Sequence, residues 1–258
     1  MVKRDRLPRV LLYDIEMLPN IVYSWGLWDQ NIQPENIIKE KSLICVAYRW
    51  LGETKVHSCS ILDDPRAFLK DPYNDKVVVT HLHKIFEEAD AIIAHNGDRF
   101  DFTIFNARAI KYGLPPLPTI PSVDTLKVAR NKFKFNSNKL DYLGEYFGLG
   151  RKIKVDGSLW RRIAGGEVKA VREMITYNKQ DVVLLEAVYM KLRPFMTNHP
   201  NLNILGGRCQ ELSCRICGSR KVQRRGYTNL GYAKFQCTMC QAWSKSGVVV
   251  RKTAEVLR

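Results

Sequence analysis

The sequence predicts an α/β protein that carries a small, β-rich second domain. Candidate strands come early in the chain, long helical patterns follow with one strand among them, and five of the seven cysteines lie between 209 and 240. Strands and helices in this order are typical of a sheet covered by helices. The 258 residues suffice for one large domain and one small one.

The expected elements follow from the spacing of apolar side chains, which recurs every second residue in strands and every third or fourth in helices. Strands are expected at 9–16, 21–27, 42–50, 55–61 and 90–95. Helices are expected near 77–88, 99–112, 122–132, 139–148 and 167–196. The segment 28–41 is predicted to be a polar connection, and 114–122, with four prolines, a rigid loop.

Acidic side chains stand at the ends of these elements. Asp14 and Glu16 lie two positions apart in the first strand, so they share one of its faces. Burying two carboxylates side by side is costly unless a cation is bound, and hard oxygen ligands suit Mg²⁺ or Mn²⁺. A solvated acidic turn explains this pair equally well. Asp101 begins a helix after an Asn-Gly turn, where it can act as a cap, and Asp98 competes for the same role.

Tyr177 and Asp181 lie four residues apart in a long helical stretch and project from one helix face. With the preceding motifs they complete the series D-x-E, N-x-x-x-F-D and Y-x-x-x-D, which resembles the tyrosine-bearing (DEDDy) branch of the DEDD exonuclease superfamily. The proofreading domain of family-B DNA polymerases is most similar. The matching residues are Asp14, Glu16, Asn96, Phe100, Asp101, Tyr177 and Asp181. The resemblance covers roughly 9–196, and Thr176 stands where the other branch carries histidine.

This resemblance implies a ribonuclease H-like fold, in which a mixed, mostly five-stranded sheet is flanked by helices. It also implies two Mg²⁺ or Mn²⁺ ions, with Asp14 bridging both and Glu16 and Asp181 completing the site of the attacking water. Asp101 would hold the second ion, and Tyr177 would orient the water or the phosphate. The ions would flank the scissile phosphate, so no strong base is needed.

The cysteines give a second strong pattern. Cys214 and Cys217 form one C-x2-C pair, and Cys237 and Cys240 form another after nineteen intervening residues. This spacing predicts one structural Zn²⁺ held by four thiolates in a zinc ribbon. Cys209 falls outside the pattern. Cys45 and Cys59 lie in candidate strands and are expected to be buried.

Breaks in the pattern and the charge distribution divide the chain. We expect a catalytic domain at 1–196, a linker at 197–208 and a zinc-ribbon domain at 209–258. The formal net charge is +15, of which 206–258 contributes +9, so the ribbon is expected to grip nucleic acid. Candidate exposed aromatic residues there are Tyr227, Tyr232 and Trp243. Substrate contacts are expected from Asn96, Phe100, Trp243, Lys221, Arg224 and Arg225. The run 131–139 interleaves basic and aromatic residues, which suits a strand channel or amphipathic packing equally.

These observations predict a metal-dependent 3′–5′ exonuclease that acts on DNA, with single-stranded ends as substrate. The alternatives are a non-catalytic nucleic-acid adaptor, which the intact acidic set disfavours, and an exonuclease directed at RNA. No apolar run approaches about 18 residues and the N-terminus lacks a signal-peptide core, so a cytoplasmic protein without membrane partners is expected. The combination of nuclease and ribbon resembles enzymes of bacterial or phage replication and repair, whose proteins are possible partners.

Overall fold

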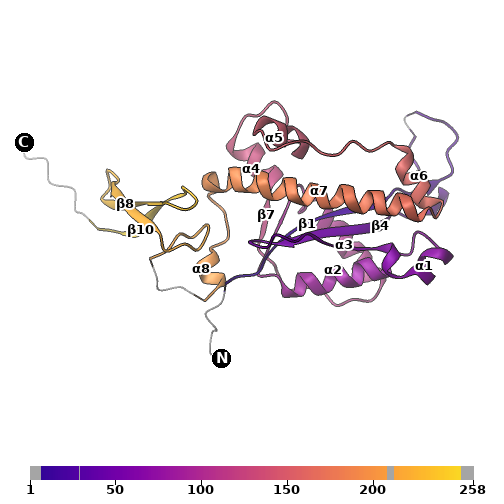
Figure 1. Ribbon diagram of the computed structural model, residues 1–258, viewed down its shortest axis with the longest axis horizontal. Helices are drawn as coiled ribbons and strands as arrows, with labels where there is room; N and C mark the ends of the chain where they lie inside the picture. Colours follow the sequence, from indigo (N-terminus) through magenta and orange to yellow (C-terminus); the bar gives the residue numbers. More distant parts are fainter. Residues whose placement is uncertain (1–6, 29, 208–211, 251–258) are drawn as a thin grey trace, which may run out of the picture.

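The computed structural model describes residues 7–28, 30–207 and 212–250, and its centre is a five-stranded mixed sheet (Figure 1). The strands are β1 (Val10–Leu18), β4 (Ser42–Trp50), β5 (His57–Ser60), β6 (Ala91–Ala94) and β7 (Ser122–Asp124). Their order is β5-β4-β1-β6-β7; β1, β4 and β5 pair antiparallel, whereas β6 and β7 continue parallel to β1. The mixed sheet confirms the predicted fold class.

Helices cover both faces of this sheet. One layer holds α1 (Pro65–Lys70), α2 (Lys76–Glu88) and α3 (Asp101–Lys111), and the other holds α4 (Thr125–Lys132), α5 (Leu140–Tyr146), α6 (Ser158–Ala164) and α7 (Val168–Leu192). Figure 1 shows α7 running along one side of the sheet and α2 along the other. The short helices α1 and α6 were not predicted, because one or two turns show too little periodicity.

The alternation of side chains in β1 decides where its acidic residues point. Leu11, Tyr13 and Ile15 belong to the core cluster that includes the buried residues of α2 and α3. Leu12 belongs to the second cluster, with the C-terminal half of α7. Asp14 and Glu16 follow Leu12 at intervals of two, so both face α7.

The long helix α7 brings polar groups to that same face. Its buried positions recur at intervals of three and four and are mostly apolar, which packs the helix on the sheet. Asn178 and Asp181 are the exceptions, and both are fully buried within this stripe. The helix ends at Leu192, before the 3-10 turn Arg193–Phe195, and not at 196 as predicted. Pro194 lies in that turn and lacks the backbone donor that a continuing helix needs.

The predicted strand 21–27 is wrong for most of its length. Only Ile21–Val22 (β2) is a strand, and it pairs with β3 (Ile37–Lys39) in a separate two-stranded sheet. Residues 23–28 carry exposed aromatic side chains, including Trp25 at 99% exposure, and no buried alternation holds them in the main sheet. The segment 28–41, predicted to be a polar connection, contains β3.

The fifth strand of the main sheet is instead β7 (Ser122–Asp124), in a segment predicted to be helical. Three residues are too few to show a strand period. The helix α4 begins only at Thr125, because the Asp124 carboxylate accepts hydrogen bonds from the N–H groups of Leu126 and Lys127 and caps it.

The cysteine-rich region forms a separate antiparallel sheet in the order β10-β9-β8. Its strands are β8 (Val222–Tyr227), β9 (Tyr232–Cys237) and β10 (Trp243–Val249). Figure 1 shows this sheet beyond the C-terminal end of α7. None of the helices in the described residues is both long and apolar enough to cross a membrane.

The segment between the two sheets contains a short helix, α8 (Leu202–Leu205). Leu202 is buried in the core cluster of α7, and its backbone N–H donates to the Arg215 carbonyl at 3.0 Å. The Asn203 side chain donates to the Cys214 carbonyl at 3.0 Å. The segment is therefore attached both to the main core and to the first cysteine pair.

Candidate active site

Three carboxylates meet between β1 and α7. Asp14 and Glu16 come from β1 and Asp181 from α7, and their ligand oxygens all lie within 4.8 Å of one another. Asp181 is fully buried, whereas Asp14 and Glu16 are partly exposed. We call these three residues the acidic cluster.

Asp101, the first residue of α3, lies against strand β1. Its Oδ1 accepts a hydrogen bond from the Ile15 backbone N–H at 3.2 Å, between the two acidic positions of β1. Only 4% of Asp101 is exposed. The preceding turn permits this placement, because Asn96 adopts φ 70° and a Cβ at Gly97 would lie 2.4 Å from the Ala94 Cβ.

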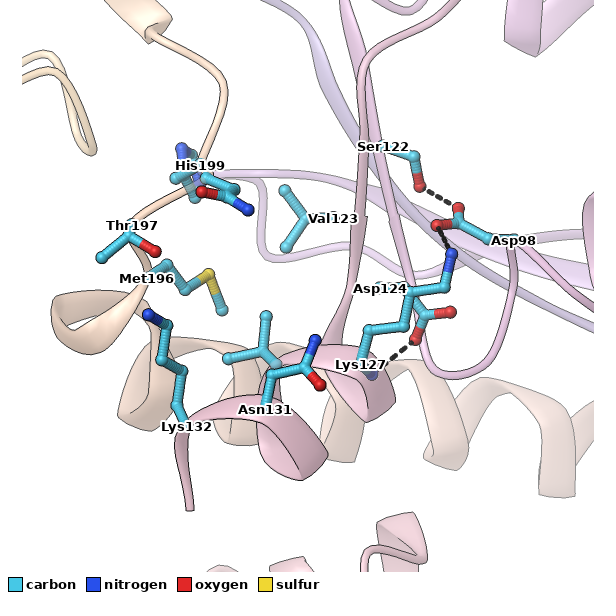
Figure 2. A pocket seen from close by; sticks show the side chains of 12 residues that line it. Asp98, Ser122, Val123, Asp124, Lys127, Asn131, Lys132, Met196, Thr197 and His199 are labelled. Atoms are coloured by element: carbon cyan, nitrogen blue, oxygen red, sulfur yellow. Dashed lines mark hydrogen bonds and ion pairs between the residues drawn. The ribbon is translucent and has the colours of Figure 1, made fainter.

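Asp98, the competing aspartate, points elsewhere. Its carboxylate accepts a hydrogen bond from the Ser122 hydroxyl and pairs with the Lys127 ammonium at 2.8 Å (Figure 2). It lines a cavity of about 270 Å³ bounded by β7, α4 and the segment after α7, which Met196 and His199 also line. This cavity contains no member of the acidic cluster, whereas the charge of Asp101 raises the pKa of Asp14, so Asp101 is the aspartate of its turn that lies beside the cluster.

Lys152, which the sequence analysis did not single out, contacts the acidic cluster. Lys152 Nζ donates to Asp181 Oδ2 at 2.5 Å and to the Tyr177 hydroxyl at 3.4 Å. Tyr177 is one turn before Asp181 on α7, as its spacing predicts. Lys152 belongs to an irregular segment between α5 and α6, where the spacing of apolar residues does not predict which side chains point inward. The only signal was the local concentration of positive charge in Arg151–Lys154.

Asn178 is a second residue that the sequence analysis missed. Its Nδ2 donates to Asp14 Oδ2 at 2.7 Å, and its Oδ1 accepts from the Cys45 thiol at 3.6 Å. The asparagine is fully buried, so it fixes the orientation of the Asp14 carboxylate. Its position three residues before Asp181, on the same helix face, was the available signal. Cys45 and Cys59 are buried, as predicted.

The three carboxylates of the acidic cluster have raised pKa values, because their negative charges are desolvated and close together. Burial, followed by the charges of Asp101 and Glu16, raises the pKa of Asp14 well above its usual value. Burial and the nearby Asp181 raise the pKa of Glu16 to about 7. Burial raises the pKa of Asp181 although Lys152 opposes this, and Asp181 Oδ1 is buried with no hydrogen-bond partner. A single lysine does not balance these charges, and the oxygen-rich donor set fits divalent cations such as Mg²⁺ or Mn²⁺.

Without added divalent cations, the protein is expected to lose stability as the pH rises from 5 to 7.5. Glu16 has a usual pKa near 4.5 in the unfolded chain and a pKa of about 7 in the folded protein, so the folded state retains the proton. The proton retained on Glu16 therefore adds on the order of 3 kcal/mol to the free energy of unfolding below pH 4.5. This contribution is lost as the pH rises through 7. Chemical denaturation across this pH range measures the effect.

The variant Glu16→Gln is the control for this pH dependence. It keeps the side-chain volume and removes the titrating group, so its stability curve should be flatter than that of the wild type. Millimolar Mg²⁺ should flatten the wild-type curve as well. Parallel curves for the two proteins would show that Glu16 titrates normally.

A cleft of about 670 Å³ adjoins the acidic cluster at Lys152. Asn96, Arg130, Asn138 and Lys139 also line it. His95, at the end of β6, is held by hydrogen bonds to the Thr125 hydroxyl and the Asn138 carbonyl, as expected for a strand-end histidine. Phe100 is 44% exposed and precedes Asp101.

The aromatic residues of the run 131–139 pack against one another and against neighbouring rings. The Phe133 and Phe135 rings stack with centroids 5.0 Å apart, and Phe195 and Phe147 pack against them. Amphipathic packing therefore accounts for these two rings, while Lys139 of the same run lines the cleft.

The four paired cysteines also meet at one point. The sulfurs of Cys214, Cys217, Cys237 and Cys240 all lie within 4.8 Å of one another, and the cysteines are free. Each pair ends in a tight turn: Gly218 has φ 73° and Gln241 has φ 63°. Their N–H groups donate to the Cys214 and Cys237 carbonyls at 2.7 and 2.9 Å. Four clustered sulfurs in two similar turns are compatible with zinc. Cys209 lies outside the described residues.

The predicted ribbon contacts are distributed over different surfaces. Trp243 is 56% exposed on β10. Arg225 donates to Gln236, whereas Arg224 donates to the Tyr227 hydroxyl. Lys221 lines a cavity of about 430 Å³ between the ribbon and the main core. The structure therefore does not gather these four side chains on one surface, and none of them lines the cleft at Asn96.

The fold and the acidic site together define a class of protein. The sequence profile of the RNase H superfamily matches residues 55–193, more than half of the chain, and the protein belongs to this superfamily. The matched range includes Asp101, Tyr177 and Asp181 and begins after Asp14 and Glu16.

Two DNA polymerases are similar to this chain, one in sequence and one in fold. The DNA polymerase III PolC-type of Ureaplasma parvum is 37% identical over 67 residues, which make up 26% of this chain and 4% of that protein. The family B DNA polymerase from the archaeon Pyrobaculum calidifontis shares the fold with a TM-score of 0.54 and 17% identity, over 89% of this chain and 32% of that one. The chain therefore spans only a small part of the relatives that it matches.

Proposed function

We propose that this protein is a metal-dependent 3′–5′ exonuclease of the DEDDy type that hydrolyses phosphodiester bonds of DNA, acting on single-stranded ends. The observation that carries the proposal is the meeting of Asp14, Glu16 and Asp181 within 4.8 Å, on an RNase H superfamily fold. These carboxylates, with Asp101, would hold two Mg²⁺ or Mn²⁺ ions. Bound ions would stabilise the attacking and leaving oxygens and lower the pKa of the attacking water.

The protein's own residues have separable roles in this proposal. Asn178 orients the Asp14 carboxylate, and the Ile15 N–H orients Asp101. The Tyr177 hydroxyl would donate a hydrogen bond to the attacking water or the phosphate. Burial and the Asp181 charge raise the pKa of this phenol to about 12, so it stays protonated and acts as a donor and not as a base. Lys152 places a positive charge beside the same carboxylate.

DNA is favoured as substrate by the two polymerase relatives, and the 3′–5′ polarity is inferred from the motif resemblance. The cleft beside Lys152, with Arg130, Lys139 and Asn96, would receive the strand end, and the amide of Asn96 would position it. We place the catalytic domain at 1–196, the connecting segment at 197–208 and a zinc-ribbon domain at 209–258. The four cysteines would hold one structural Zn²⁺, and the ribbon would add affinity for nucleic acid.

The test is a product ladder. The protein is incubated with 5′-labelled single-stranded and duplex DNA and RNA, with Mg²⁺, with Mn²⁺ or without added divalent ions. Stepwise shortening of the labelled strand, only with added Mg²⁺ or Mn²⁺ and faster on DNA, is the expected result. Tight binding without cleavage under every condition would favour the adaptor, and faster shortening of RNA would change the substrate.

Asp101→Asn is expected to lower the cleavage rate by at least about 10²-fold, or roughly 2.7 kcal/mol in the barrier, because it removes a proposed metal ligand. Asp98→Asn, three residues earlier in the same turn, should stay within about threefold of the wild type, since its carboxylate points to Ser122 and Lys127. Single-turnover kinetics on labelled DNA measures both. The reverse ranking would mean that the two aspartates have been exchanged.

Tyr177→Phe is expected to reduce the cleavage rate by about 10²-fold or less, because one positioning hydrogen bond is lost while the ring still packs. Metal affinity should change little, since the phenol is not a proposed ligand. Tyr146→Phe, an exposed tyrosine on α5, is the control. A main defect in the Mg²⁺ titration, with a normal rate at saturating metal, would contradict the assignment.

A further inference from the structure

The sheet of the cysteine region has two chemically different faces, and strand register separates them. Residues directly opposite one another in antiparallel strands point to the same face. Trp243 is opposite Gln236, and Lys245 is opposite Lys234. Arg225 joins them, because its Nε donates to Gln236 Oε1 at 3.1 Å. Lys245 Nζ lies 4.9 Å from the centroid of the Tyr232 ring. We call this the aromatic–basic face, formed by Arg225, Tyr232, Lys234, Gln236, Trp243 and Lys245.

The opposite face is used for packing. Val222 is opposite Cys237, and Val222 packs against the cysteine cluster. Arg224 is opposite Phe235 on this face, and its guanidinium donates to the Tyr227 hydroxyl at 3.2 Å. Neighbouring arginines therefore point in opposite directions: Arg225 belongs to the aromatic–basic face and Arg224 does not, although the sequence suggested both as substrate contacts.

The aromatic–basic face carries charge of one sign together with exposed ring surface. Residues 212–250 contain seven lysines and arginines and no acidic residue. On β10, Trp243 and Lys245 are exposed while Ser244 and Ser246 are partly buried, so the strand presents this face to solvent. Trp243 is 56% exposed, and burial in the ribbon core does not account for so large an apolar side chain there.

We propose that the aromatic–basic face binds a single strand of nucleic acid, with the rings of Trp243 and Tyr232 stacking on bases and with Arg225, Lys234 and Lys245 contacting phosphates. Cations beside aromatic rings match the alternation of phosphate and base along such a strand. An acidic peptide would also pair with the cations but has no base to place on the indole. The inference rests on the proposed function for the identity of the ligand class and assigns the strand to one face of the ribbon.

The test uses the full, zinc-loaded chain in an Asp14→Asn background, so that the oligonucleotide is not cleaved. Fluorescence anisotropy gives Kd for labelled oligothymidine of about 15 nucleotides, within the length range that such sites cover. Each variant is first checked for zinc content, which reports whether the ribbon is folded. The variants are Trp243→Ala, Trp243→Phe, Arg225→Ala and the matched control Arg224→Ala.

Stacking and charge should leave different signatures. Trp243→Ala is expected to weaken binding about 5- to 150-fold without changing the salt slope, and Trp243→Phe should restore most of the loss. Arg225→Ala should weaken binding and make the slope of log K against log salt shallower by about 0.7, the value for one phosphate contact on a single strand. Arg224→Ala should leave both quantities close to those of the parent.

Equal effects of Arg224→Ala and Arg225→Ala would overturn the proposal, because diffuse positive charge would then explain binding. An unchanged Kd in Trp243→Ala would overturn it as well. If polyglutamate of matched charge competes as well as unlabelled oligothymidine, the face takes acidic protein instead. These binding measurements involve no cleavage, so their failure can be distinguished from failure of the proposed function. The ladder assay can fail while variants of the aromatic–basic face bind as expected, or the ladder can appear while these variants bind like the parent.

Discussion

Asp14→Asn is expected to lower the cleavage rate by at least about 10³-fold, which corresponds to roughly 4 kcal/mol of lost transition-state stabilisation. Asp14 is one of the carboxylates that would hold the metal ions, and the motif resemblance implies that it serves both, so its loss would weaken both sites at once. Asparagine keeps the shape of the side chain, and its carbonyl oxygen can still accept the Asn178 hydrogen bond. Single-turnover cleavage of labelled DNA at saturating Mg²⁺ measures the effect.

The same substitution should leave the metal-free protein as stable as the wild type or more stable. Desolvation and the charges of Asp101 and Glu16 raise the pKa of Asp14, and removing one charge from a repelling group relieves that cost. Thermal unfolding without added divalent ions measures this. Asp98→Asn serves as the control for loss of an aspartate outside the site. Near-wild-type cleavage by Asp14→Asn, with wild-type metal affinity, would remove Asp14 from the mechanism.

Cys214→Ser is expected to lower the zinc content from about one ion per chain to near zero and to unfold residues 212–250. Structural zinc contributes about 10–16 kcal/mol to the folding of small modules, and three thiolates hold it poorly. The ribbon has only a small cluster of buried residues around the cysteines to replace it. Elemental analysis gives the zinc content, and hydrogen exchange of β8–β10 reports unfolding.

Cys59→Ser is the matched control for this experiment. Cys59 is also buried, but it lies in β5 of the main sheet and outside the four-sulfur cluster. The Cys59→Ser variant should retain one zinc per chain. In Cys214→Ser the exchange protection of α8 should fall as well, because Leu202 and Asn203 donate hydrogen bonds to the carbonyls of Arg215 and Cys214. Full zinc content in Cys214→Ser would exclude this cysteine as a ligand.

Most of the main fold and part of the site could be predicted because they depend on local periodicity. The two-residue spacing of Asp14 and Glu16 and the four-residue spacing of Tyr177 and Asp181 fix shared faces within a strand and within a helix. The paired cysteines likewise reflect local turns. Strand β7 was missed because three residues carry no measurable period, and 21–27 was mistaken for a sheet strand because apolar residues there lie exposed.

The sequence by itself determined the class of fold, the candidate acidic residues and the pairing of cysteines, since each follows from neighbours along the chain. Only the tertiary structure decided that Lys152 contacts Asp181, that Asn178 contacts Asp14, and that Asp101 and not Asp98 lies beside these carboxylates. These relations join segments up to 164 residues apart, and the sequence pattern of one element does not specify what packs against it.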